Sequence, residues 1–305
     1  MLSTIFSADF FSAILRCTTP ILFAALAASV AQKSGICNMA LEGIMLFCAL
    51  FGVLFTSVTG NFLTGLILTM IAGGLIGMLL AFFVLNLKTD EILAAIAINL
   101  IAEGGTVLLM LAVSGDRGSS TSISSFSAPT IAIPLIKDIP VIGNLISGHN
   151  LMVYLALIAV VIMHIFLYKT PFGLKIRAVG ENKNAAESVG ISSRKIQYVA
   201  LILSGVLASM GGFFMSGGYM NMFTTGMVSG RGYSALAASA MGGNNPIGAF
   251  AVSLLFGASQ ALSNVMQLTE IPYQLVQMLP YLVVLIGLGV YSYSVMKRRQ
   301  SLAGK

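Results

Sequence analysis

Long apolar runs dominate this sequence. Seven of them are about 20 residues long, the length that a helix needs to cross the hydrocarbon core of a membrane. The runs cover residues 10–31, 39–58, 61–87, 91–113, 150–168, 197–218 and 272–295. The 305-residue chain is 57% hydrophobic and has only 16 Lys or Arg and 10 Asp or Glu residues, too few charges to cover a water-soluble protein. We therefore expect an all-α fold, a polytopic transmembrane helical bundle that occupies residues 1–305 as a single domain.

Three other classes of protein are disfavoured by the same residues. The apolar runs do not alternate with polar residues, as the strands of an outer-membrane barrel must. Cys17, Cys37 and Cys48 show no CxxC or Cys/His spacing, so neither a disulfide framework nor a metal site is predicted. The apolar residues before Arg16 are unlike the basic start of a signal peptide. The net charge of +6 comes from basic residues in the regions described next, where the positive-inside rule explains them. We therefore expect no nucleic-acid partner.

Basic residues gather in two places, and these places predict the orientation of the chain. One is the loop over residues 169–196 and the other is the C-terminal tail. The residues are Lys169, Lys175, Arg177, Lys183, Arg194 and Lys195 in the loop, and Lys297, Arg298, Arg299 and Lys305 in the tail. Because basic loops stay on the cytoplasmic side, both regions are expected there. The same count places the N-terminus and a long loop over residues 114–149 outside.

The stretch between the last two runs is predicted to form a helical hairpin. Both ends of residues 196–296 are expected in the cytoplasm, so the number of crossings between them must be even. The segment 233–263 must therefore enter and leave on the outer side, which gives about nine crossings in total. Its turn is expected at residues 242–246, at or near the cytoplasmic side, with Pro246 in the first turn of the second helix. GGLIG (73–77) and GMVSG (226–230) match the small-xxx-small pattern of closely packed helices, and in a chain with 32 glycines such matches indicate only that helices pack tightly.

Helix punctuation marks a short helix inside the basic loop. Asn184 is a suitable N-cap, Glu187 follows three residues later as in a capping box, and Gly190 suits the position after the C-cap. We expect a helix from about Ala185 to Val189. Its basic flanks would hold it against the inner leaflet or against a partner protein.

Three sequence blocks resemble a family of membrane-spanning subunits of ABC importers, the branch that serves ribose-like sugars, nucleosides and branched-chain amino acids. TPFGLKIRAVGENKNAAESVGIS followed by LSGVLASMGG (203–212) is similar to the cytoplasmic coupling loop of that family. GYSALAASAMGGNNPIGAF (232–250) is similar to its short helix and glycine-rich turn. SGICNMALEGIMLF (34–47) resembles its glycine- and acid-containing break between spans.

The resemblance implies a permease subunit in a bacterial cell membrane, with no chemistry of its own. No G-x-x-x-x-G-K-[ST] phosphate loop occurs in the sequence, so ATP and Mg²⁺ are expected on a separate ATPase subunit. Further implied partners are a second permease, identical or different, an extracytoplasmic substrate-binding protein and membrane lipid. The coupling role falls on Arg177, Asn184, Ala185, Ala186, Glu187, Val189 and Gly190.

Polar residues inside the apolar runs are the candidates for the transport path. A charge at the centre of a membrane-spanning helix costs about 2.5 to 3.5 kcal/mol on insertion scales. Such charges therefore face water or a partner. The charged candidates are Arg16, Glu42 and Glu103, together with Arg231, which lies just outside the hairpin segment 233–263. One interpretation makes them part of the path; the other pairs Arg16 with Glu42 or Glu103. Asn38 and Asn99 each precede a glutamate by four residues. The substrate path is accordingly predicted at Asn38, Glu42, Asn99 and Glu103.

These groups suit a neutral, hydrogen-bonding solute, since no arginine cluster faces them. NMALEGIML resembles the nucleoside-type permeases most closely, and importers of simple sugars or branched-chain amino acids are the alternatives.

A secondary transporter is disfavoured because the sequence shows no inverted repeat. An intramembrane enzyme is disfavoured because HExxH, G-x-S-x-G and paired aspartates are missing from the sequence.

Overall fold

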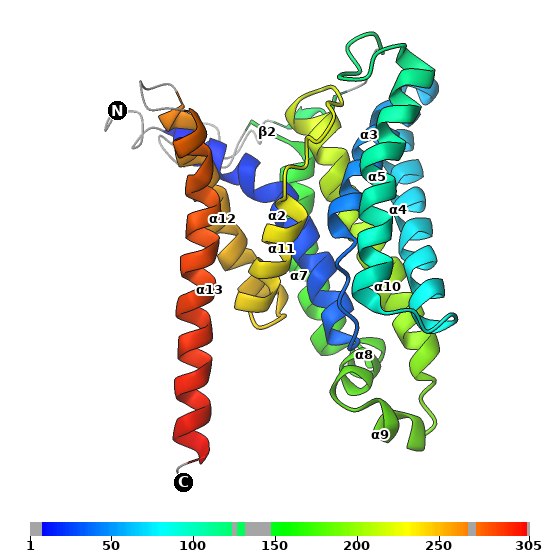
Figure 1. Cartoon of the computed structure of the whole chain (residues 1–305), viewed down its shortest axis with the longest axis vertical. Coiled ribbons are helices and arrows are strands. Elements are labelled where there is room, and N and C mark those ends of the chain that lie inside the picture. The colour runs from blue at the N-terminus through cyan, green and yellow to red at the C-terminus, as the bar shows by residue number, and fades with distance from the viewer. Residues whose placement is uncertain (1–7, 124–126, 132–147, 268–272, 304–305) are drawn as a thin grey trace.

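The computed structural model describes residues 8–123, 127–131, 148–267 and 273–303. Helices account for nearly all of them (Figure 1). The helices are α2 (Ala8–Lys33), α3 (Leu41–Thr59), α4 (Phe62–Leu85), α5 (Glu91–Ser114), α7 (Leu151–Lys169), α8 (Pro171–Glu181), α9 (Lys183–Ser188), α10 (Ser193–Phe214), the π-helix η1 (Met215–Tyr219), α11 (Arg231–Met241), α12 (Pro246–Met266) and α13 (Tyr273–Ala303). Strands β1 (Thr130–Ile131) and β2 (His149–Asn150) pair antiparallel. Residues 132–147 of the expected outer loop lie outside the described residues.

The predicted transmembrane bundle is confirmed. Within the described residues, seven helices are long and apolar enough to cross a membrane, and six of them coincide with the predicted runs. The seventh is α12, which belongs to the predicted hairpin. The last predicted run, 272–295, corresponds to α13, whose described apolar part is Met278–Tyr293.

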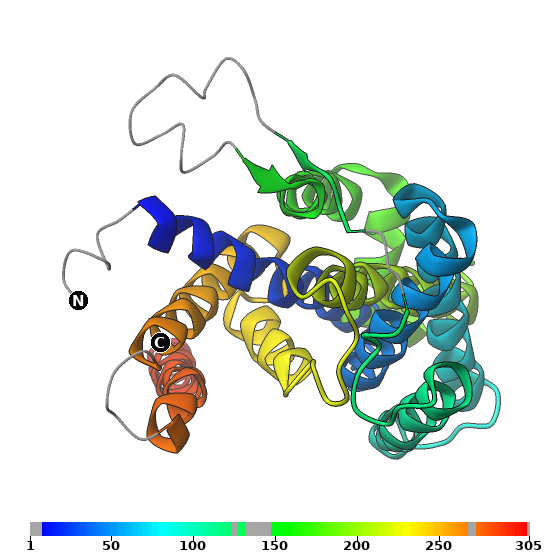
Figure 2. The same ribbon diagram turned by 90° about the horizontal axis from the view of Figure 1, so that it is seen from above.

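Helices α2 and α10 form the centre of the bundle. Of their apolar windows, 83% and 72% are buried, against 33% for α4 and α5, which therefore present most of their surface to the outside of the bundle. Figure 2 shows α2 running through the middle of the bundle, with α4 and α5 at one edge. Close backbone contact joins α10 to α4, because Gly205 lies against Gly73 and Gly77. Small residues allow this approach between membrane helices.

The hairpin is present as predicted. Helix α11 runs down to a turn at residues 242–245, and α12 returns beside it (Figure 1). Gly242 and Gly248 meet backbone to backbone across the turn. Pro246 occupies the first turn of α12, and the Asn245 side chain caps that helix by accepting the N–H of Ile247 at 3.2 Å. The turn lies at about the level of the connection between α4 and α5 in Figure 1.

Of the two small-xxx-small matches, GGLIG (73–77) lies in a close helix pair, since Gly73 and Gly77 lie against Gly205, and GMVSG does not. The GMVSG segment (226–230) is not part of a close helix pair, because it is non-helical chain that leads into α11. Gly226 and Gly230 have φ angles of +68° and +77°, which right-handed helical residues do not adopt. The glycines therefore serve the backbone path here and do not bring two helices together.

Candidate functional site

Two helices of the bundle begin next to non-helical chain, and this leaves backbone N–H groups to be satisfied. Helix α3 follows the break at residues 34–40, and α11 follows the segment 220–230. The first N–H groups of a helix have no partner within it, and in a membrane an unpaired backbone group is costly. The side chains that supply these partners define the centre of the candidate site.

Glu42 provides the cap for α11. Its carboxylate accepts the N–H of Gly230 at 2.7 Å and the N–H of Gly232 at 2.8 Å. Gly230 is the N-cap residue of α11 and has no side chain that could cap the helix. A negative charge is also favourable at this end of a helix, where the macrodipole is positive. The carboxylate therefore joins α3 to α11 through two charge-assisted hydrogen bonds.

Asn99 plays the same part for α3. Its Oδ1 accepts the N–H of Gly43 at 2.8 Å, and its Nδ2 donates to the Met39 carbonyl and to the Tyr233 hydroxyl, both at 3.1 Å. A side chain of α5 thus caps α3, and a side chain of α3 caps α11. We call Asn99, Glu42 and the N–H groups that they bind the cap relay.

A cavity of about 210 Å³ lies beside the cap relay. Glu42, Asn99, Glu103 and Tyr233 contribute its polar side chains, and Gly226 and Ser229 belong to its wall. Glu103 is exposed. Three of the four predicted path residues therefore border one cavity.

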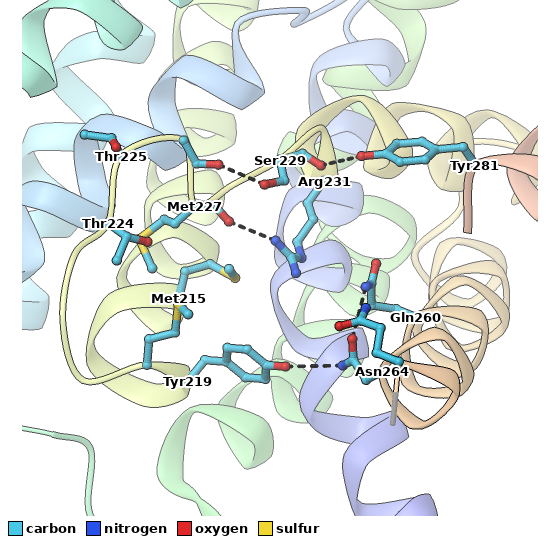
Figure 3. Close-up of a pocket in the computed structure, with 13 residues that line it drawn as sticks. Met215, Tyr219, Thr224, Thr225, Met227, Ser229, Arg231, Gln260, Asn264 and Tyr281 are labelled. Carbon is cyan, nitrogen blue, oxygen red and sulfur yellow. Dashed lines mark hydrogen bonds between the residues drawn. The ribbon is translucent and has the colours of Figure 1, made fainter. Parts of the chain in front are cut away.

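A second cavity, of about 330 Å³, lies on the other side of residues 226–230 (Figure 3). Both cavities include Gly226 and Ser229 in their lining, so we call residues 226–230 the dividing segment. Figure 3 shows the side chains of Met215, Tyr219, Arg231, Gln260 and Asn264 pointing toward this space. The π-helix η1 places both Met215 and Tyr219 there, and π-helical turns are frequent at functional sites.

Arg231 and Tyr281 hold the dividing segment from the side of the larger cavity. Arg231 Nη1 donates to the carbonyls of Met227 at 2.9 Å and Val228 at 3.1 Å. The Tyr281 hydroxyl donates to the Ser229 carbonyl at 2.9 Å. With the cap relay on the opposite side, this non-helical chain is bound from both cavities.

The structure places the remaining predicted residues elsewhere. Asn38 is 1% exposed and lines neither cavity. Its Nδ2 donates to Ser204 Oγ at 2.9 Å and its Oδ1 accepts the N–H of Ala40 at 3.1 Å, so it fastens the break to α10. The interpretation that pairs Arg16 with Glu42 or Glu103 is wrong for Glu42, whose carboxylate binds the N–H groups of Gly230 and Gly232.

The short helix predicted in the basic loop is present as α9, but its predicted N-cap is wrong. Asn182, not Asn184, caps the helix, and its Oδ1 accepts the N–H of Ala185 at 3.0 Å. Glu187 is therefore too far along the helix to complete a capping box. The other end agrees with the prediction: Gly190 has φ +81° and follows the C-cap residue. Its N–H and that of Ile191 bind the carbonyls of Glu187 and Ala186, as in a Schellman motif.

The apolar residues of α9 and its C-terminal end divide between the interior and the surface. Ala186 is 4% exposed and packs inside the chain, whereas Val189 is 75% exposed and Ala185 is exposed as well. Arg177 lies on α8 with its guanidinium carbon 4.8 Å from the centre of the Tyr168 ring. This stacking on an aromatic face is a cation–π contact.

Backbone contacts connect this cytoplasmic region to the break at residues 34–40. Gly180, near the end of α8, lies against the carbonyl of Lys33 and against Gly35. Gln197 Nε2 also donates to the Ser34 carbonyl at 3.1 Å. The break leads on to Glu42, so a displacement of α8 and α9 has a short route to the cap relay.

Two side chains of the larger cavity were missed by sequence reasoning. Gln260 and Asn264 lie four residues apart on α12 and face the same space (Figure 3). The available signal was their spacing, since i and i+4 residues share one face of a helix.

Comparison with known proteins identifies the family. The family described as "Branched-chain amino acid transport system / permease component" matches residues 10–288. The chain is 32% identical to the guanosine ABC transporter permease protein NupQ of Bacillus subtilis, over 88% of this chain and 87% of the relative. It is 32% identical to the nucleoside ABC transporter permease protein NupC of Lactococcus lactis, over 90% and 89% of the two chains.

A relative named for a different solute matches at lower identity. The glucose ABC transporter permease protein TsgB13 of Haloferax volcanii is 24% identical over 81% of this chain and 71% of the relative. No solved structure matches significantly. The family match covers most of the chain, and the names of the similar proteins agree with that family. The chain therefore belongs to the permease-component family of branched-chain amino acid transport systems and is a multi-pass membrane protein of the ABC transporter class.

Proposed function

We propose that this chain is the permease subunit of an ATP-driven nucleoside importer. The observation that carries the proposal is the 32% identity, over 88% and 90% of the chain, to two permeases named for guanosine and for nucleosides. The two polar cavities on either side of the dividing segment support it. In this proposal the solute passes these cavities, with Glu42, Asn99 and Glu103 along the path and Asn38 as a support behind it.

A neutral solute fits the charges of the larger cavity. Arg231 is the charged residue among those that line it, and its Nη1 is engaged by two carbonyls of the dividing segment. A phosphorylated solute would need several converging donors for its negative charge. A nucleoside needs hydrogen-bonding groups and an aromatic or apolar face, and Tyr219, Gln260 and Asn264 supply these.

The energy for transport would come from a separate subunit. We propose that an ATPase binds ATP and Mg²⁺ and engages α9, the exposed Val189 and the basic side chains around it. From α9, the contact of Gly180 with the break would carry movement toward the cap relay. An extracytoplasmic binding protein and a second permease, identical or different, would complete the importer. In this arrangement the N-terminus lies outside and the C-terminus in the cytoplasm.

A sugar importer is the second candidate. The likeness to a permease named for glucose favours it, because sugars are also neutral and rich in hydrogen-bonding groups. The nucleoside proposal ranks first because both nucleoside-named relatives are more similar over a larger share of the chain.

Uptake of radiolabelled solutes tests the proposal. A strain that lacks the gene would be compared with the complemented strain for guanosine, cytidine, ribose, glucose and leucine, and the complex would be purified to identify the co-purifying ATPase. We expect nucleoside uptake to depend on the gene and on ATP. Uptake of only ribose or glucose would replace the substrate class, and uptake by the chain alone under an ion gradient would overturn the importer assignment.

A further inference from the structure

Gln260 and Asn264 form a pair of amides in the larger cavity that the packing of the protein does not use fully. Gln260 Nε2 lies 3.5 Å from Asn264 Oδ1, and Asn264 Nδ2 lies 3.5 Å from the Tyr219 hydroxyl and 3.7 Å from Cys17 Sγ. Amide hydrogen bonds in proteins are usually 2.9 to 3.0 Å long. The two amides are therefore held loosely and keep hydrogen-bonding capacity for a ligand.

The other polar contacts of this cavity are short and serve the protein itself. Arg231 and Tyr281 bind carbonyls of the dividing segment at 2.9 to 3.1 Å. They position the wall of the cavity. The amide pair on α12 stands across from this wall, beside the ring of Tyr219 (Figure 3). The cavity thus combines a fixed wall with a group of loosely bonded donors and acceptors.

The chemistry of the amide pair suits the edge of a nucleobase. A side-chain amide presents a donor and an acceptor side by side, and Asn and Gln use both at once on the edge of adenine. An aromatic ring such as that of Tyr219 offers a stacking surface for any base. A pentose or hexose has hydroxyl groups but no amide-like edge with a donor and an acceptor side by side. A volume of about 330 Å³ is at the small end of ligand pockets.

We propose that Gln260, Asn264 and Tyr219 form the subsite that recognises the base of the nucleoside during its passage. This inference rests on the proposed function, because it assigns the substrate class of that function to particular residues. The amides would bind the hydrogen-bonding edge of the base, and the tyrosine would contact its face. Different bases present different edges, so this subsite would set the relative rates at which nucleosides are transported.

The test compares nucleosides with one another in the assembled importer. Uptake of guanosine and cytidine at saturating concentration would be measured for the wild type, Asn264→Leu, Asn264→Asp and Gln260→Leu. We expect the ratio of the two rates to change at least about fivefold, the lower end of the discrimination that a bidentate amide contact provides. Leu255→Ala is the matched control, since Leu255 lies on the same helix but is 50% exposed and does not line the cavity.

The possible outcomes test the subsite assignment and the proposed function separately. If the wild type takes up no nucleoside, the proposed substrate class fails. If the wild type takes up nucleosides and all three variants keep the wild-type ratio, the subsite assignment is wrong while the importer stands. An equal fall for both nucleosides would indicate a structural role and would also overturn the subsite. Asn264→Asp keeps the shape of the side chain, so it reports on hydrogen bonding if the leucine variants do not assemble.

Discussion

Polar side chains within the apolar helices act first on the backbone. Glu42 and Asn99 accept N–H groups at the starts of α11 and α3, where a helix leaves donors unpaired. Water is not there to satisfy these groups in a membrane, so the side chains allow the helices to begin where they do. The same interruptions border the smaller cavity. One set of residues thus maintains the broken helices and lines the space that the breaks create.

Replacing Glu42 with glutamine is expected to destabilise the protein. Glutamine has one acceptor oxygen, whereas the carboxylate accepts from both Gly230 and Gly232. The amide group of glutamine would also face an N–H. We expect a cost of about 1.5 to 3 kcal/mol, the usual value of one hydrogen bond to a charged group. The measurement is the midpoint of thermal unfolding in detergent.

Glu103→Gln is the matched control for this change. Glu103 borders the same cavity, but its carboxylate accepts no hydrogen bond from the described residues. Its substitution should leave the unfolding midpoint unchanged. Equal midpoints for the two variants would mean that Glu42 does not hold α11 through the bonds described.

At the scale of elements, short helices and turns are set by a few special positions. Helix α9 has only six residues, too few to be stable by itself. Asn182 satisfies its start, and Gly190 allows the left-handed residue that ends it. The close contact between Gly180 and Lys33 then seats the preceding helix α8 on the end of α2. These positions fix the shape of the surface formed by α8 and α9, which the proposed function assigns to the ATPase.

Asn182→Ala combined with Gly190→Ala is expected to uncouple transport from ATP hydrolysis. The first change removes a cap worth about 0.5 to 2 kcal/mol, and the second puts a side chain at a left-handed position at a cost of about 1 to 2 kcal/mol. No atom would meet the new Cβ at Gly190, so the effect there is on the backbone alone. Uptake per ATP hydrolysed by the purified complex should fall at least about tenfold while membrane insertion persists.

Asn61→Ala combined with Gly60→Ala serves as the comparison, because it removes an N-cap and a left-handed glycine away from α9, between α3 and α4. Its uptake per ATP should stay near the wild-type value. The coupling assignment fails if the α9 double variant also transports normally with a correctly assembled complex.

At the scale of the whole molecule, the sequence predicted the bundle well and the cavities only in part. Apolar runs identify membrane helices because hydrocarbon tolerates little else. The even-crossing argument led to the hairpin from charges alone. The contacts of Glu42 with Gly230 and Gly232 join residues 188 and 190 positions apart, and no local pattern encodes such a pairing. Asn182 and Asn184 both satisfy the local rule for an N-cap, so that rule cannot place the start of α9.

The orientation of the hairpin gives a prediction about the whole chain. The α11–α12 turn lies at about the level of the start of α5 in Figure 1, whereas residue 117 follows the other end of that helix, and basic residues are expected to stay in the cytoplasm. Ala240 is exposed in the last turn of α11. A cysteine there, in a chain whose Cys17, Cys37 and Cys48 are replaced by serine, should react with an impermeant maleimide only in inverted vesicles.

Arg117→Cys and Glu187→Cys provide the two reference sides for this labelling experiment. Both positions are exposed, the first after α5 and the second on α9. We expect Arg117→Cys to react in intact cells, and Glu187→Cys to react only in inverted vesicles, like Ala240→Cys. Labelling of Ala240→Cys and Arg117→Cys from the same side would contradict the hairpin. Such a result would leave α12 as a single crossing and would place the basic tail outside, against the charge rule from which the topology was derived.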